Sequence, residues 1–190
     1  MHIVQNKIQI FKWLILWLGA WGISQWLWGG DPLRPSTVPG TILIIFLVAL
    51  ALAFILFPKE RKVWLSRLAA PETLVILLSI VAFSLVDQRP LMNNLLTSAH
   101  VLFQQLMIAV LVFMKPSEKF SQAAWRVIFF FGASHLLLSV FMSWPWTLLF
   151  SVLASITGVV FAYLIQRIKY GITISFIIHL GFYLIFFNLI

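Results

Sequence analysis

Polar side chains interrupt the long apolar runs of this 190-residue chain at a few positions, and these residues are the ones that could do chemistry. Histidine and glutamine are the most informative types. An imidazole can act as a base or as a hydrogen-bond partner, whereas an amide can only donate and accept hydrogen bonds. The polar positions that we place deep within the runs are, in chain order, His100, Gln104, Gln105, Ser134, His135, Ser139, Ser151, Ser155, Thr157, Thr173, Ser175, His179, Tyr183 and Asn188, with His100 and Asn188 nearer the ends of their runs.

Carboxylates are missing from these runs. The acidic residues all fall in polar segments or at the ends of apolar runs: Asp31, Glu60, Glu72, Asp87 and Glu118. This distribution argues against an aspartyl intramembrane protease, a carboxylate proton relay and a carboxylate-bound metal. The absence of cysteine excludes disulfides, thiolate nucleophiles and sulfur-ligated metals. We therefore expect no metal and no cofactor.

Seven apolar runs carry the polar positions, each close to the length of helix that crosses a bilayer. We predict them at Ile8–Trp28, Thr41–Phe57, Glu72–Val86, Leu95–Met114, Trp125–Met142, Thr147–Ile165 and Ile172–Ile190. The third run is short, so a tilted or re-entrant segment is the alternative there. With 62% hydrophobic and 9% charged residues, the composition excludes a water-soluble globule and a disordered chain.

Lysine and arginine alternate between the connections of these runs. One side holds Lys7, Lys12, Lys59, Arg61, Lys62, Arg67, Lys115, Lys119, Arg126, Arg167 and Lys169, and the other side holds only Arg34 and Arg89. The excess of basic residues on cytoplasmic loops predicts a cytoplasmic N-terminus and a C-terminus on the far side. The basic segment 58–71 is expected to be partly helical and to lie near anionic headgroups. Because the net charge of +8 is spread over loops, nucleic acid is not an expected partner.

The fold class predicted from these patterns is an all-α polytopic membrane bundle of about seven transmembrane helices, placed in a bacterial plasma membrane. We expect a single transmembrane domain over residues 1–190, with helices one to three in 1–94 and helices four to seven in 95–190. The lipid bilayer is then the first partner of the chain.

Three polar positions on different runs fall at one depth. At about 1.5 Å per residue, Gln104, His135 and His179 lie roughly 15, 14 and 12 Å from the cytoplasmic ends of their helices. We therefore expect a common polar pocket, because histidine and glutamine avoid lipid and can satisfy one another inside a bundle. The simpler alternative for each is an ordinary interhelical hydrogen bond. The serine and threonine hydroxyls are expected to bond to the backbone.

Tryptophans recur every four residues on one face of the first run, at Trp13, Trp17 and Trp21. Such a stripe is typical of a face that packs against lipid or another helix, and a partner protein could dock on it. Tryptophans near the ends of runs suit the membrane interface, and they are Trp26, Trp28, Trp64, Trp125, Trp144 and Trp146.

The second half of the chain resembles the CAAX-protease and bacteriocin-processing (CPBP, also Abi) family of intramembrane endopeptidases. The second motif of that family, Phe-x-x-x-His, is matched by Phe131 to His135, and the third, His-x-x-x-Asn, is matched by His179 with Tyr183 at the last position. The resemblance implies a site built from His135 and His179, with Phe131 and Tyr183 as binding residues.

The first motif of the family, Glu-Glu-x-x-x-Arg, aligns with the segment that begins at Gln104 and Gln105 and ends at Ala109. In the family a glutamate is thought to activate water, and an amide cannot act as a general base. Loss of a general base lowers a rate by about 10²–10⁴-fold. The resemblance therefore implies a catalytically inactive relative that binds or stabilises another membrane protein or a membrane-embedded peptide.

Three alternatives stay open. The first is an active endopeptidase that uses His135 and His179, with a glutamine to position water. The second is a rhomboid-like serine protease with Ser134 as nucleophile and His179 as base, because Gly132-Ala133-Ser134 is similar to the rhomboid Gly-x-Ser-Gly motif. The third is a small transporter subunit, although no charged intramembrane residue or repeat symmetry favours it.

Overall fold

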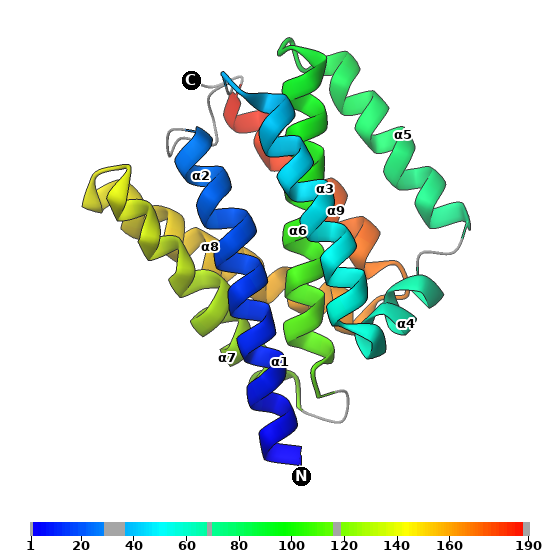
Figure 1. Ribbon diagram of the computed structural model, residues 1–190. Helices are drawn as coiled ribbons and strands as arrows, with labels where there is room; N and C mark the ends of the chain where they lie inside the picture. Colours follow the sequence, from blue (N-terminus) through cyan, green and yellow to red (C-terminus); the bar gives the residue numbers. More distant parts are fainter. Residues whose placement is uncertain (1, 29–36, 68–69, 116–118, 188–190) are drawn as a thin grey trace.

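A computed structural model shows a bundle of helices (Figure 1), and it describes residues 2–28, 37–67, 70–115 and 119–187. Within these ranges the chain is helical and contains no strand, which confirms the all-α prediction. Arg34, Asn188 and the end of the seventh predicted run lie outside the described residues.

The first half of the chain forms three long helical stretches and one short polar helix. α1 (His2–Trp17), the π-helical η1 (Leu18–Gly22) and α2 (Ile23–Trp28) follow one another without a break. Next come α3 (Pro39–Leu56), α4 (Pro58–Arg67) and α5 (Ala70–Val86). Proline opens both α3 and α4, where its missing N–H is tolerated because the first turn has no partner for it. Residues 58–67 of the predicted basic segment thus form the helix α4.

The second half begins with α6 (Leu91–Phe113), which starts earlier than the predicted Leu95. Asparagine is typical of loops, so Asn93 and Asn94 were expected to precede the helix. In the structure they belong to it, and their carbonyl oxygens accept hydrogen bonds from the hydroxyl groups of Thr97 and Ser98 in the next turn. The remaining elements are α7 (Phe120–Arg126), the π-helical η2 (Val127–Gly132), the 3-10 helix η3 (Ala133–Val140), α8 (Trp144–Arg167) and α9 (Gly171–Phe187). α7, η2 and η3 form one continuous stretch.

α6 is the central helix of the bundle (Figure 1). In the most apolar stretch of α6, 89% of the residues are buried, whereas the share is 22% in α3 and 28% in α8. α3, α5, α8 and α9 all pack against α6. A helix that is covered on all sides can carry polar side chains without exposing them to lipid, and α6 carries His100, Gln104 and Gln105.

The outer surface of the bundle is strongly apolar. Large apolar side chains such as Ile44, Leu77 and Leu85 are more than half exposed, which a water-soluble bundle would avoid. Among the described residues, four helical stretches are long and apolar enough to cross a membrane: Pro39–Leu56, Leu91–Phe113, Phe120–Val140 and Trp144–Arg167. Pro71–Val86 and Gly171–Ile185 are apolar but shorter. These features indicate an integral membrane protein.

The tryptophan stripe of the first helix is a helix-packing face. Trp13 and Trp17 are fully buried, and the rings stack in sequence with centroids 5.3 Å apart for Trp13–Trp17 and 5.6 Å for Trp17–Trp21. The indole N–H of Trp13 donates to the Met107 carbonyl oxygen at 2.8 Å, and that of Trp17 donates to Ser134 Oγ at 2.9 Å. The prediction that a partner could dock on this stripe is therefore wrong, because the stripe joins the first helix to α6 and η3.

The tryptophans near the ends of the apolar runs divide into two groups. Trp28 and Trp64 are buried against other parts of the bundle. The others have more than half of their surface exposed, as expected at a membrane interface, and they are Trp26, Trp125, Trp144 and Trp146.

Two glycines allow α8 to cross η2 closely. A Cβ atom on Gly132 would overlap Ser155 Oγ and lie 3.0 Å from Ser155 Cα, and one on Gly158 would lie 2.9 Å from Val127 Cγ1. Ser151 Oγ donates to the Gly132 carbonyl oxygen across the same contact at 3.0 Å. The close crossing holds the segment that carries Phe131 and His135 against α8.

Candidate functional site

Gln104 and Gln105 are neighbours on α6, but their amides bind different histidines. Gln104 Nε2 donates to Nε2 of His100, one turn earlier on the same helix, at 2.8 Å. Gln105 Nε2 donates to Nδ1 of His179 on α9, at 2.9 Å. Both side chains are almost fully buried, and neither amide oxygen has a hydrogen-bond partner among the described residues. The two amides therefore fix the orientation of two imidazole rings.

His135 follows the π-helical turn η2, and its ring is held by the carbonyl group of Phe131. Nδ1 lies 2.8 Å from that oxygen. Because a carbonyl oxygen only accepts hydrogen bonds, Nδ1 carries the proton and Nε2 carries a lone pair. The ring packs against Trp21 at a centroid distance of 5.3 Å and against Phe131 at 5.0 Å. Both aromatic residues lie in π-helical turns, which occur frequently at functional sites.

Aromatic rings also enclose the other two histidines. His179 stacks against Phe161, at a centroid distance of 5.3 Å, and against Tyr183, at 5.5 Å, with ring planes 28° and 29° apart. His100 stacks on Phe46 at 4.9 Å and meets the edge of Tyr183 at 6.1 Å. Tyr183 thus links the two imidazoles that the glutamines orient.

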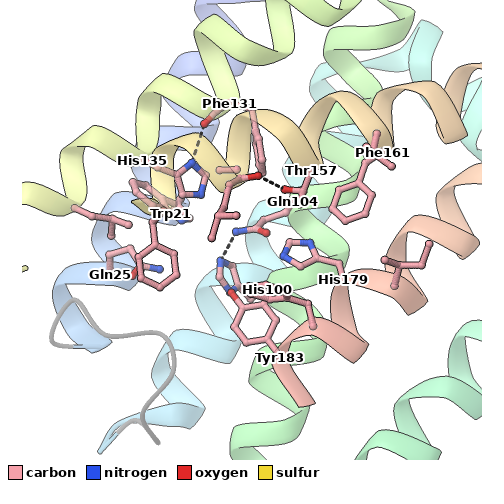
Figure 2. A pocket seen from close by; sticks show the side chains of 17 residues that line it. Trp21, Gln25, His100, Gln104, Phe131, His135, Thr157, Phe161, His179 and Tyr183 are labelled. Atoms are coloured by element: carbon pink, nitrogen blue, oxygen red, sulfur yellow. Dashed lines mark hydrogen bonds between the residues drawn. The ribbon is translucent and has the colours of Figure 1, made fainter. Parts of the chain in front are cut away.

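The three histidines line a cavity of about 190 Å³ between the first helix, α6, η2, η3, α8 and α9 (Figure 2). Of the six residues singled out from the sequence, Gln104, Phe131, His135, His179 and Tyr183 line this cavity. Gln105 is not part of the wall and reaches the cavity only through its hydrogen bond to His179. Among the residues singled out from the sequence, the cavity brings together side chains up to 79 positions apart, from Gln104 to Tyr183.

Sequence reasoning missed several residues of the cavity wall as site residues: Trp21, Gln25, His100 and Thr157. A signal existed for two of them. His100 precedes Gln104 by one helical turn, and Gln25 follows Trp21 by one turn, so each shares a face with a neighbour that also lines the cavity. The depth estimate placed His100 closer to the outer end of its helix and therefore left it out.

The chemistry available in this cavity is that of uncharged groups. No lysine, arginine, aspartate or glutamate belongs to its wall, and the described residues contain no group of three or more histidine, cysteine or acidic side chains that could hold a metal ion. Imidazole nitrogens, amides and aromatic faces remain. They can bind a ligand by hydrogen bonding and stacking.

The position of Ser134 does not suit the role of a nucleophile. Its hydroxyl donates to the Phe131 carbonyl oxygen at 2.7 Å and accepts from the Trp17 indole at 2.9 Å. It does not line the cavity, and the pair with His179 that a serine protease of this kind needs is not formed. Other hydroxyls bond to the backbone as expected: Thr157, for example, donates to the Leu153 carbonyl oxygen at 2.7 Å.

Comparison of the chain with protein-family models, with curated proteins and with solved structures gives no match. The likeness to the CPBP family therefore rests on the motif residues themselves.

Proposed function

We propose that this protein is a polytopic membrane protein that binds a partner in its cavity without hydrolysing it. The observation that carries the proposal is that amides orient two imidazoles of the cavity wall, Gln104 that of His100 and Gln105 that of His179, and that the wall contains no carboxylate. Both amides donate hydrogen bonds to the imidazoles. An amide in that role holds a ring in place but cannot take a proton from water.

The same proposal makes the chain an inactive relative of the CPBP endopeptidases. Its site would keep the two motif histidines, His135 and His179, and would replace the glutamates by Gln104 and Gln105. The arrangement of His135 and His179 around one cavity supports this interpretation. The retained residues would then recognise a membrane protein or a membrane-embedded peptide.

We further propose that seven helical stretches cross the membrane, with the N-terminus in the cytoplasm of a bacterial cell. The start of α1, the helix α4 and the end of α6 lie at one end of the bundle, and the turn between α5 and α6 lies at the other (Figure 1). The first end carries most of the basic side chains, which supports the orientation.

Photo-crosslinking from two neighbouring positions of α8 tests the binding function. Thr157 lines the cavity, whereas Ile156 is 59% exposed on the outer surface and is not part of the wall. A photoreactive residue at Thr157 is expected to crosslink a membrane protein or peptide segment in native membranes. The same residue at Ile156 is expected to crosslink mainly lipid. Lipid adducts alone from both positions would contradict the proposal.

A second candidate function is an active endopeptidase, and the free lone pair on His135 Nε2 favours it. Neutral imidazole is a competent base. This candidate predicts that the protein in lipid nanodiscs cleaves transmembrane peptides and that His135→Ala abolishes the cleavage. The binding function predicts no new peptide termini by mass spectrometry with either form.

A further inference from the structure

The wall of the cavity contains hydrogen-bonding atoms that no described residue satisfies. Gln25 is only 1% exposed, and neither its amide nitrogen nor its amide oxygen has a partner there. The amide oxygen of Gln104 is in the same situation. Buried polar groups are nearly always paired, and lipid offers no hydrogen bonds to replace the missing ones. The wall is therefore suited to a ligand that brings polar atoms with it.

His135 and His179 give the cavity one acceptor and one donor. On His135, the proton is on Nδ1 because this nitrogen donates to the Phe131 carbonyl oxygen, so Nε2 accepts. On His179, Nδ1 accepts from the Gln105 amide, so the proton is on Nε2, which donates. A hydroxyl group both donates and accepts, so its chemistry matches this pair of nitrogens.

The size and the remaining walls of the cavity fit a single ring. Its volume of about 190 Å³ exceeds the roughly 150 Å³ that is enough to hold benzene. Aromatic side chains form much of the wall, and ring–ring contacts in offset or edge-on geometry would stabilise an aromatic occupant. These side chains are Trp21, Phe131, Phe150, Phe161, Phe182 and Tyr183. The lack of charged residues in the wall requires that the occupant be neutral.

The cavity approaches the outer surface of the bundle at α8 and α9. Val160 of α8 and Ile178 of α9 both line the cavity, and each is 50% exposed. Residues with these two properties mark where the cavity approaches the lipid-facing surface. An occupant would enter sideways from the bilayer, between α8 and α9, and would therefore be lipid-soluble or attached to a membrane segment.

We propose that the cavity binds a neutral phenolic ring, with the phenol hydroxyl between Nε2 of His135 and Nε2 of His179. This inference rests on the proposed binding function and names the chemical group that is recognised. A tyrosine side chain on a membrane segment and a free lipid-soluble phenol carry the same group. The phenol is neutral at physiological pH because its pKa is about 10.

Fluorine NMR with two small probes tests the chemistry. 4-Fluorophenol and fluorobenzene differ only by the hydroxyl, and each is titrated against the protein in nanodiscs of phosphatidylcholine and phosphatidylglycerol, with empty nanodiscs as background. We expect 4-fluorophenol to bind at least tenfold more tightly than fluorobenzene. Equal affinities, or no binding above the empty nanodiscs, would overturn the proposal.

Two variants locate the bound probe. His135→Phe is expected to lower the affinity for 4-fluorophenol to that for fluorobenzene, and Ala154→Phe, which fills the cavity, is expected to abolish binding of both probes. Gln166→Leu is the control, because Gln166 also has a buried amide oxygen without a partner among the described residues but lies outside the cavity wall. Folding of each variant is checked by thermal unfolding. Binding that survives Ala154→Phe would place the probe elsewhere and contradict the proposal.

Competition separates the two sources of the phenol. A transmembrane peptide with one tyrosine near its centre, its phenylalanine counterpart, and 4-dodecylphenol are each added to the bound probe. Displacement by the tyrosine peptide alone assigns a side chain, and displacement by dodecylphenol alone assigns a free phenol. Displacement by neither overturns the inference. A Thr157 crosslink to a partner without any phenol binding would leave the proposed function standing and reject only this inference.

Discussion

The hydrogen bond between Gln105 and His179 is a polar contact that joins α6 to α9 inside the bundle. Replacing the amide with an apolar side chain of similar size leaves His179 Nδ1 without its donor. We expect Gln105→Leu to lower the free energy of unfolding by about 1–2 kcal/mol, the range for a buried hydrogen bond within a membrane. Thermal unfolding in mild detergent measures the loss. An unchanged midpoint would show that the amide does not stabilise the ring.

Glu60, at the start of α4, has a carboxylate that the fold buries. Burial raises the pKa of Glu60 above its ordinary value of 4.5, although Lys59 and Lys12 oppose the shift. The protonated form is therefore favoured in the folded state, and its stabilising effect is lost as the pH rises from 4.5 through the raised pKa. Glu60→Gln is expected to be more stable than the wild type at pH 7.5, and the difference is expected to shrink toward pH 5. Unfolding curves of both proteins at several pH values check the sign, and a difference that grows on acidification would contradict it.

At the scale of helices, the pattern of apolar residues predicted each long helical stretch, but it did not predict where a stretch departs from α-helical geometry. The run Trp125–Met142 reads as one ordinary helix, yet it contains the π-helical η2 and the 3-10 helix η3. A π turn contains about one residue more than an α-helical turn, and a 3-10 turn contains fewer. The average hydrophobicity of a run is the same in each case and therefore does not reveal these turns. The local geometry at His135 depends on packing against α8, which a single sequence does not display.

A site residue was predictable where it was polar, lay within an apolar run, and had a depth in the membrane that could be estimated from the end of its helix. Gln104, His135 and His179 were placed in this way, and they line one cavity. Gln25 follows Trp21 by one helical turn, but it was not predicted as a site residue, because a polar residue near the end of an apolar run is typical of the membrane interface. The unpaired amide of that residue is visible only once the surrounding helices are in position.

The crossing of α8 over η2 depends on glycine. A methyl group on Gly132 would meet the side chain and backbone of Ser155, whereas one on Gly19 would find no atom within 4 Å among the described residues. Gly132→Ala is therefore expected to push α8 outward and destabilise the protein by about 1–3 kcal/mol. Gly19→Ala is expected to be neutral or to stabilise by about 0.5–1 kcal/mol, since alanine favours helix over glycine. Unfolding midpoints compare the two, and equal effects would show that the close contact is relaxed.

The whole molecule is an apolar bundle built around a polar central helix. Its stability in a membrane cannot come from driving apolar groups away from water, because lipid is equally apolar. Buried contacts between polar groups and close packing at small residues must contribute instead. This explains why α6 carries so many polar side chains at low exposure, among them Asn94, Thr97 and Gln105.

The absence of cysteine in the natural sequence makes the proposed seven-span orientation directly testable. Single cysteines are introduced at exposed positions in five connections: Lys62, Gln88, Lys119, Ser143 and Lys169. If the N-terminus is cytoplasmic, a membrane-impermeant maleimide added to intact cells is expected to label the cysteines at Gln88 and Ser143 only. The other three are expected to react only after the membrane is permeabilised, because they belong to the basic end that the positive-inside rule retains in the cytoplasm. Labelling of Gln88→Cys and Lys62→Cys from the same side would show that α5 does not cross the bilayer. Labelling of Ser143→Cys and Lys169→Cys from the same side would show that α8 does not cross the bilayer.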